Sequence, residues 1–248
     1  MLRQLFRSVL AIGFWLVVVS VLWVLVLRVF PPPVTWLMAQ QAGEQGSVRR
    51  TWVPLSGMSR AMPMAVIAAE DQKFFDHHGF DLEAMRKAYE YNVRKKGRRT
   101  KGASTLSQQT AKNVFCWPGR TYVRKAAEAW FTLLIEGLWS KERIIEVYLN
   151  IAETGKGRFG VEQAARDCYK HGAARLTAEK AARIAAVLPL PRKRNACAST
   201  ARSGWIMRQM TNLGDLFDPT VRERVRLEQE RREERAKARA KRRARKQG

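Results

Sequence analysis

The sequence predicts an all-α globular domain carried on an apolar N-terminal helix. Three observations predict this class. Stretches with apolar residues at helical spacing follow one another along the chain, divided by short runs that contain Gly, Pro or Ser. No stretch alternates polar and apolar residues as a half-buried strand does. The 248 residues leave room for one domain with a substantial core and for extensions at its ends.

The segment from Val9 to Leu27 contains no charged residue. At about 1.5 Å per residue it nearly spans a hydrocarbon core of about 30 Å, and three prolines at 31–33 end it. A cleaved signal peptide is the alternative, but the run is longer than a usual signal core and no small-x-small site follows it closely. We therefore expect a basic segment over residues 1–8 and a transmembrane helix over residues 9–30. Arginines on both sides leave its orientation open.

Changes in composition predict the rest of the domain organisation. We expect a linker over residues 31–50, a globular domain over residues 51–214 and a basic charged tail over residues 215–248. Side-chain oxygens at Asp81, at Ser104 or Thr105, and at Ser140 can cap helices of the domain. The expected helices cover residues 62–70, 81–95, 104–115, 122–139, 140–150, 161–169, 177–188 and 203–213.

The charge balance is strongly basic, with a formal net charge of +24. Such a surplus suggests an anionic partner: nucleic acid, anionic lipid or a phosphorylated substrate. The tail opens with Asp218 and Pro219, which is typical of a helix start, but it has hardly any apolar stripe. We expect a solvated basic helix or a disordered tail. Its role stays open between binding lipid headgroups or nucleic acid and simply keeping the chain soluble.

Cysteine and histidine residues do not predict a metal site. The sequence has three cysteines, an odd number, and they are widely spaced: Cys116, Cys168 and Cys197. This pattern favours isolated buried thiols over a disulfide framework or a zinc site. His77 and His78 are neighbours and cannot easily face one ion.

A pair of acids, Glu70 and Asp71, stands at the end of an apolar run. The run draws Glu70 toward the interior, and a partly buried carboxylate has a raised pKa that suits proton transfer near neutrality. The alternative is a helix-end pair that faces solvent.

Two further segments carry polar residues at informative spacing. On a helix, Thr105, Gln108, Gln109 and Lys112 share one side, and a glycine-containing loop before a helix N-terminus can receive an anion. The order of residues is not that of a P-loop, so nucleotide hydrolysis is not expected. The third segment contains Arg124, Lys125 and Glu128. Arg124 and Glu128 form either a surface pair at i, i+4 or part of a pyrophosphate site.

Together these segments resemble the first three signature motifs of the family 51 glycosyltransferases, the peptidoglycan polymerases. The motif Glu-Asp-x-x-Phe-x-x-His-x-Gly is matched by Glu70, Asp71, Phe74, His77 and Gly79. The motif Gly-x-Ser-Thr-x-x-Gln-Gln-x-x-Lys-Asn is matched from Gly102 to Asn113, and Arg-Lys-x-x-Glu is matched by Arg124, Lys125 and Glu128. Two later motifs resemble residues 141–150 and 160–165, so the resemblance covers roughly residues 50–214.

The sequence departs from the family pattern at two places. Ala103 stands where many members have a second glycine, and Cys-Tyr-Lys at 168–170 stands where a Tyr-Phe-Gly type run is common. Two-domain members also carry a transpeptidase with Ser-x-x-Lys and Lys-Thr-Gly motifs. Neither motif occurs here, so the resemblance is to the monofunctional branch.

The resemblance implies a lysozyme-like helical fold and an inverting transfer. The growing lipid-pyrophosphate-linked glycan is transferred to the 4-hydroxyl of a lipid-linked disaccharide pentapeptide (lipid II), forming a β-1,4 bond. Glu70 and Glu128 are then the catalytic residues: Glu70 as general base, Glu128 as the group that orients cations or holds Mg²⁺ or Mn²⁺. No organic cofactor is expected. The expected substrate-binding residues are Asp71, Phe74, His77, Gly79, Ser104, Thr105, Gln108, Gln109, Lys112, Asn113, Arg124 and Lys125, of which Lys112, Arg124 and Lys125 stabilise the leaving pyrophosphate.

The resemblance also implies a place and partners. It places a single-pass protein in the bacterial inner membrane with its catalytic domain on the periplasmic side, acting with other cell-wall synthesis or division proteins. Two other functions stay open. A lytic transglycosylase or lysozyme-like hydrolase also has one key Glu, but needs neither pyrophosphate-binding cations nor an anchor. A basic, membrane-tethered binder of nucleic acid would explain the tail but not the Glu-Asp and Gln-Gln motifs, so nucleic acid is not expected.

Overall fold

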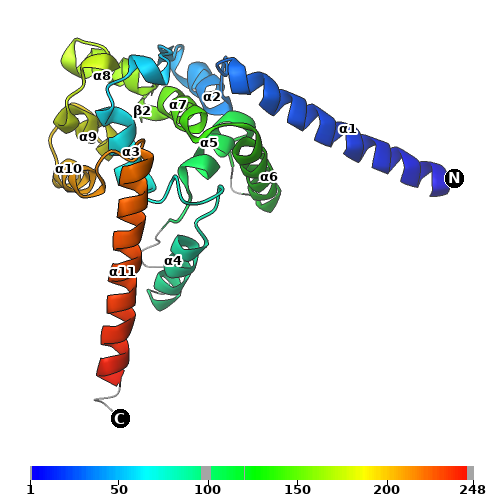
Figure 1. The fold of residues 1–248 in the computed structure, drawn as a ribbon. Helices are drawn as coiled ribbons and strands as arrows, with labels where there is room; N and C mark the ends of the chain where they lie inside the picture. Colours follow the sequence, from blue (N-terminus) through cyan, green and yellow to red (C-terminus); the bar gives the residue numbers. More distant parts are fainter. Residues whose placement is uncertain (1, 96–101, 120, 245–248) are drawn as a thin grey trace.

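The computed structural model describes residues 2–95, 102–119 and 121–244 and confirms the helical class (Figure 1). Helices account for nearly all the regular structure in these ranges. Their bounds are α1 Leu2–Val29, α2 Trp36–Gln45, α3 Ala61–Glu70, α4 Leu82–Arg94, α5 Leu106–Phe115, α6 Tyr122–Leu138, α7 Lys141–Ile151, α8 Val161–Tyr169, α9 Ala178–Val187, α10 Ala201–Leu213 and α11 Pro219–Ala244, with short 3₁₀ turns at Leu55–Gly57 and Ala173–Arg175.

A small sheet, which the sequence did not predict, joins the start of the domain to the segment between α7 and α8. Strand β1 (Arg49–Arg50) pairs in parallel with β3 (Arg158–Phe159), and β3 pairs antiparallel with β2 (Glu153–Gly155). Each strand has only two or three residues, so none is long enough to show the alternation by which strands are recognised.

Helix α3 forms the centre of the core. Every residue from Met62 to Ala68 is buried, because this helix is apolar on all sides. It packs against α9 and α10, while α5 packs against α6 and α7. These two groups of helices meet at the C-terminal end of α3, where Glu70 is the last helical residue.

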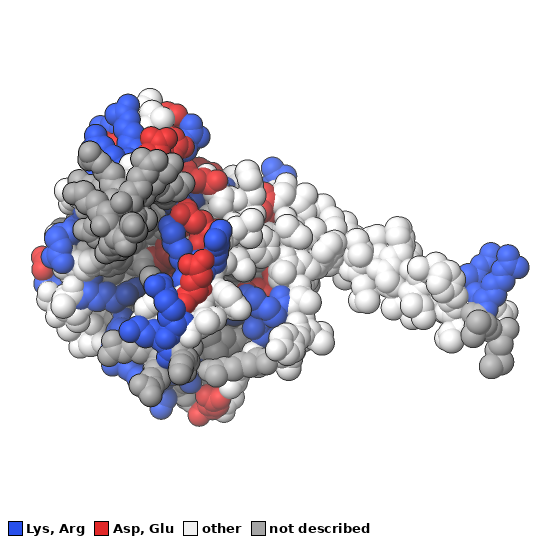
Figure 2. All heavy atoms as spheres, turned by 90° about the horizontal axis from the view of Figure 1, so that it is seen from below, with Lys and Arg blue, Asp and Glu red and all other residues white. Residues whose placement is uncertain are grey.

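Helix α1 is the one helix of the described ranges that is long and apolar enough to cross a membrane. It includes the basic segment expected over residues 1–8, and it projects from the domain as an apolar rod with Lys or Arg at its tip (Figures 1 and 2). Its last turns are docked on the domain. The indole nitrogen of Trp139 donates to the carbonyl of Val24 at 2.8 Å, and Arg143 donates to the carbonyls of Leu27 and Phe30.

The segment expected to be a linker, residues 31–50, contains helix α2. Thr35 caps α2 by accepting from the amide of Met38, and Gly46 ends the helix in the left-handed region. Met38 and Gln41 are buried, and the side chain of Gln41 accepts from the amide of Gly157. The sequence signal was weak because α2 is short and its apolar residues gather mainly in the first turn, and its burial depends on contacts with distant parts of the chain.

The expectation of three isolated thiols is also wrong. Cys168 at the end of α8 and Cys197 before α10 form a disulfide, while Cys116 is free and buried. The return of the chain after α9 brings the two sulfurs together, and their separation of 29 residues gave no sign of it.

We predict that Cys197→Ser lowers the free energy of unfolding. Closing a loop with this separation of 29 residues stabilises a fold by about 3–4 kcal/mol through the lost entropy of the unfolded chain. Thermal unfolding of wild type with and without reductant, beside Cys197→Ser, measures the effect. A wild-type Tm that does not respond to reductant would contradict it.

Candidate active site

A cleft of about 980 Å³ opens at the C-terminal end of α3. Its walls come from the end of α3, the first turns of α4, α5 and α10, and from α11. The charged side chains among the lining residues are Glu70, Asp71, Lys73, Asp81, Glu83, Lys87, Arg202 and Arg232. Ser104, Thr105 and Gln109 line the cleft from the α5 side, so the structure brings together much of the first two motifs.

The Glu70 carboxylate is held between two neighbours. One oxygen accepts from Nη2 of Arg202 at 3.1 Å and the other from Nε2 of Gln109 at 3.4 Å. Only 14% of the side chain is exposed. Burial raises the pKa of Glu70, and the Arg202 charge and the Gln109 hydrogen bond partly offset that rise. Glu70 is therefore a mostly buried carboxylate that borders the cleft, and its raised pKa makes it a better proton acceptor than an exposed glutamate.

Tyr148 fixes the orientation of Gln109. Its buried hydroxyl donates to Oε1 of Gln109 at 3.2 Å, and burial raises the pKa of Tyr148 well above its ordinary value, so the hydroxyl keeps its proton. The amide nitrogen of Gln109 must then face Glu70.

Asp71, which lines the cleft, forms a buried pair with His77. Nε2 of His77 lies 3.0 Å from Asp71, and the amide of Gly79 donates to Nδ1 of His77 at 3.1 Å. Since Nδ1 accepts, the ring proton is on Nε2 and is donated to Asp71. The same carboxylate accepts from the amide of Leu106 at 2.9 Å and so caps the first turn of α5.

Several other predicted substrate-binding residues have partners within the protein. Phe74 is fully buried under Lys141, whose ammonium lies 4.6 Å from the ring centroid. Thr105 and Gln108 form a capping box at the start of α5, so Gln108 is buried and turned away from Gln109. The Thr105 hydroxyl donates to the carbonyl of Gly79 at 2.6 Å. The four polar residues expected on one side of this helix thus do not all face substrate. Thr105 and Gln108 cap the helix, and Gln109 lines the cleft.

A second, smaller pocket of about 220 Å³ lies farther along α5. Lys112, Asn113 and Arg124 line it. The pKa of Lys112 is lowered, chiefly because neighbouring protein withdraws its ammonium from water, although part of the side chain is exposed. The charge of Glu128 opposes this shift, and the charges of Arg124 and Lys125 add to it. A site that crowds cations in this way favours a multiply charged anion.

Glu128 holds this cation group together. Its side chain is 4% exposed, and it accepts from Arg124 at 2.7 Å and from Lys125. The Arg124–Glu128 pair is therefore buried and is not the surface pair left open above, while the half-exposed Lys125 adds a second cation to the same carboxylate. This arrangement does not fit a metal site: both oxygens are taken by cations, and the described ranges hold no group of three or more His, Cys, Asp or Glu that could act as ligands.

Two residues of the site were missed from the sequence. Arg202 lies in α10, 132 residues after Glu70, and Tyr148 lies 39 residues after Gln109. No local pattern marks either residue as a partner of these side chains. A buried network of Ser107, Glu136 and Lys141 beneath the cleft was missed as well.

We predict that Arg202→Gln raises the pKa of Glu70 further. The Arg202 charge and hydrogen bond lower that pKa, so their loss requires a higher pH to ionise the carboxylate. The acid limb of the pH–rate profile should move to higher pH, and Arg202→Lys should restore part of the shift. An equal loss of rate at every pH, with no displacement of the limb, would contradict the assignment.

Comparison with known proteins agrees with this arrangement. A family model described as Transglycosylase matches residues 38–211. Proteins named biosynthetic peptidoglycan transglycosylase are similar over most of the chain. The one from Pseudomonas putida (strain W619) is 49% identical over 224 residues, which cover 86% of this chain and 94% of the relative. The one from Pseudomonas entomophila (strain L48) is 50% identical, with 86% and 92% covered, and the one from Xanthomonas campestris pv. campestris (strain B100) is 48% identical, with 86% and 90% covered. The chain belongs to the transglycosylase family.

Proposed function

We propose that this protein is a peptidoglycan glycosyltransferase that polymerises glycan strands from lipid II. The observation that carries the proposal is the arrangement along α5. Gln109 touches Glu70 in the large cleft, and Lys112, three residues and about 4.5 Å farther along the helix axis, lines the cation pocket. One rigid helix thus carries both a residue that contacts the proton acceptor and a residue that lines the anion site, which suits a glycosyl transfer from a pyrophosphate.

In the proposed reaction, Glu70 removes the proton from the acceptor's 4-hydroxyl. The oxygen attacks the anomeric carbon of the donor, and the bond from that carbon to the pyrophosphate breaks on the opposite face, which inverts α to β. The leaving pyrophosphate keeps the electron pair. Lys112, Arg124 and Lys125 stabilise the charge that builds on it, and Glu128 keeps Arg124 and Lys125 in place.

The other motif residues have positioning roles in this proposal. Asp71 and His77 fix the start of α5 relative to Glu70 through the Leu106 amide, while Phe74, Gly79 and Gln108 belong to the support of that helix end. Ser104 and Gln109 are left to contact sugar or phosphate oxygens in the cleft, and Asn113 to contact the ligand of the cation pocket.

We also propose that α1 anchors the protein in the inner membrane, with the domain on the periplasmic side. Substrates with long lipid chains keep the reaction at the bilayer surface, where the docked end of α1 holds the domain. The Cys168–Cys197 disulfide supports this side, because disulfides persist in oxidising compartments. We also propose that the protein acts with other proteins of cell-wall synthesis or division.

Mg²⁺ or Mn²⁺ has no step in this mechanism. Since Glu128 is committed to two cations, a divalent ion would have to be held mainly by the substrate's own phosphate oxygens.

The proposal is tested with the detergent-solubilised full-length chain and fluorescent lipid II. A ladder of polymer that lysozyme degrades is the expected product. Release of muropeptides from purified sacculi, without polymer, would favour a lytic enzyme instead. A salt-sensitive DNA complex without either activity would favour the nucleic-acid binder.

A further inference from the structure

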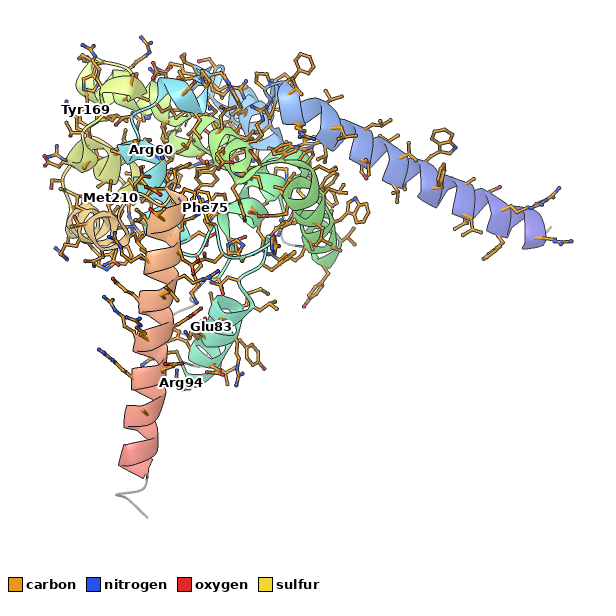
Figure 3. The ribbon with its side chains drawn as sticks, in the orientation of Figure 1. Arg60, Phe75, Glu83, Arg94, Tyr169 and Met210 are labelled. Atoms are coloured by element: carbon orange, nitrogen blue, oxygen red, sulfur yellow. A yellow bond between two sulfur atoms is a disulfide. The ribbon has the colours of Figure 1, made fainter. Side chains whose placement is uncertain are left out.

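Helix α11 is docked on the segment that follows Glu70. Phe217, just before the helix, packs edge-on against Phe75 with ring centroids 5.2 Å apart, and the Arg222 guanidinium lies 4.8 Å from the Phe75 ring. Asp218 caps the helix by accepting from Thr220. Phe75 lies at the base of α11, and the helix extends from there on the same side of the domain as α4 (Figure 3).

This docking directs one face of α11 toward the cleft. Val225 packs against the core, and Arg232 follows it by seven residues, which is two turns on nearly the same face. Arg232 lines the cleft together with Glu70, with Arg202 and with Glu83 and Lys87 of α4. The tail, which was expected to be a solvated basic helix or disordered, thus contributes Arg232 to the cleft wall.

Arg232 is the cleft cation that is least engaged within the described ranges. Its Nη2 lies 4.0 Å from Glu228 on its own helix, and 78% of its side chain is exposed. The other charged groups of the cleft have closer partners. Glu70 pairs with Arg202 at 3.1 Å, Lys73 and Lys87 pair with Glu83, Asp71 pairs with His77, and Asp81 caps α4.

We propose that Arg232 binds an anionic group of the acceptor substrate, so that α11 forms a substrate-binding wall of the cleft. The inference rests on the proposed function. The acceptor occupies the cleft on the Glu70 side, since the cation pocket takes the leaving pyrophosphate. A guanidinium suits both a stem-peptide carboxylate and a phosphate, because it can donate two parallel hydrogen bonds to either.

The test compares Arg232→Glu with Arg231→Glu in the full-length chain. Arg231 carries the same charge but lies about 100° around the helix and does not line the cleft. We expect Arg232→Glu to raise KM for lipid II about three- to tenfold with kcat unchanged, as for loss of one partly exposed charged contact, and Arg231→Glu to leave KM as in wild type.

Lipid II with amidated stem carboxylates identifies the anionic group. If the difference between wild type and Arg232→Glu disappears with this substrate, Arg232 binds a carboxylate; if it persists, Arg232 binds a phosphate. Equal KM values in the two variants would overturn the inference. This includes an equal rise in KM that becomes larger when phosphatidylglycerol is added to the mixed micelles, because such a rise indicates a contact with the membrane. A wild type without polymer would instead overturn the proposed function.

Discussion

Glu70→Gln is expected to lower the rate of polymerisation by about 10²–10⁴-fold, the usual contribution of a positioned general base. Gln keeps the size of the side chain but cannot accept the proton of the 4-hydroxyl. In wild type, burial holds the pKa of Glu70 above its ordinary value, so activity should be lost as the pH falls through a range above that of a solvent-exposed glutamate. Initial rates with lipid II across this pH range measure both effects.

The loss should not come from unfolding. A carboxyl whose pKa is raised on folding stabilises the fold below its unfolded pKa, and that contribution is lost as the pH rises. A neutral Gln therefore should not lower Tm at neutral pH. Glu83→Gln is the matched control, because Glu83 lines the same cleft but Lys73 and Lys87 lower its pKa to about 2. Substantial activity in Glu70→Gln would remove the general-base role.

Glu128→Gln is expected to reduce both activity and stability. The change leaves Arg124 and Lys125 beside Lys112 without the buried carboxylate that holds them. The cations then repel one another, and their side chains are no longer held in position. We expect kcat to fall about 10- to 100-fold, and the free energy of unfolding to fall by about 3 kcal/mol, as when one partner of a buried ion cluster is removed. Single-temperature kinetics below both Tm values separate the two effects.

Glu90→Gln provides the control for this change. Glu90 pairs with Arg86 at the same i, i+4 spacing, but both side chains are largely exposed, so the effect should stay within about 0.5 kcal/mol. The kcat of Glu128→Gln should be measured with Mg²⁺ present and after chelation. A kcat equal to that of wild type in both conditions would refute the role of the cluster in stabilising the leaving group.

The sequence predicted most helices of the domain well, because the signals that start and end them are local. Asp81, Thr105 and Ser140 each accept from an amide three residues later, as predicted for N-caps. Helix α8 has the expected bounds, Val161–Tyr169, and Gly160 with its positive φ precedes it. Helix α2 was missed because it is short and its apolar residues gather mainly in its first turn, and only packing buries Met38.

The candidate site was predicted in part. The sequence by itself determined which helices carry Glu70, Gln109 and the cations, since these positions follow from the pattern along each helix. Only the tertiary structure decided their partners: that Arg202 faces Glu70, that Cys168 meets Cys197, and that Arg232 borders the cleft. A cap acts over three or four residues and can be recognised from the sequence. The partner of a buried carboxylate depends on which distant helices pack together, and no short segment contains that information.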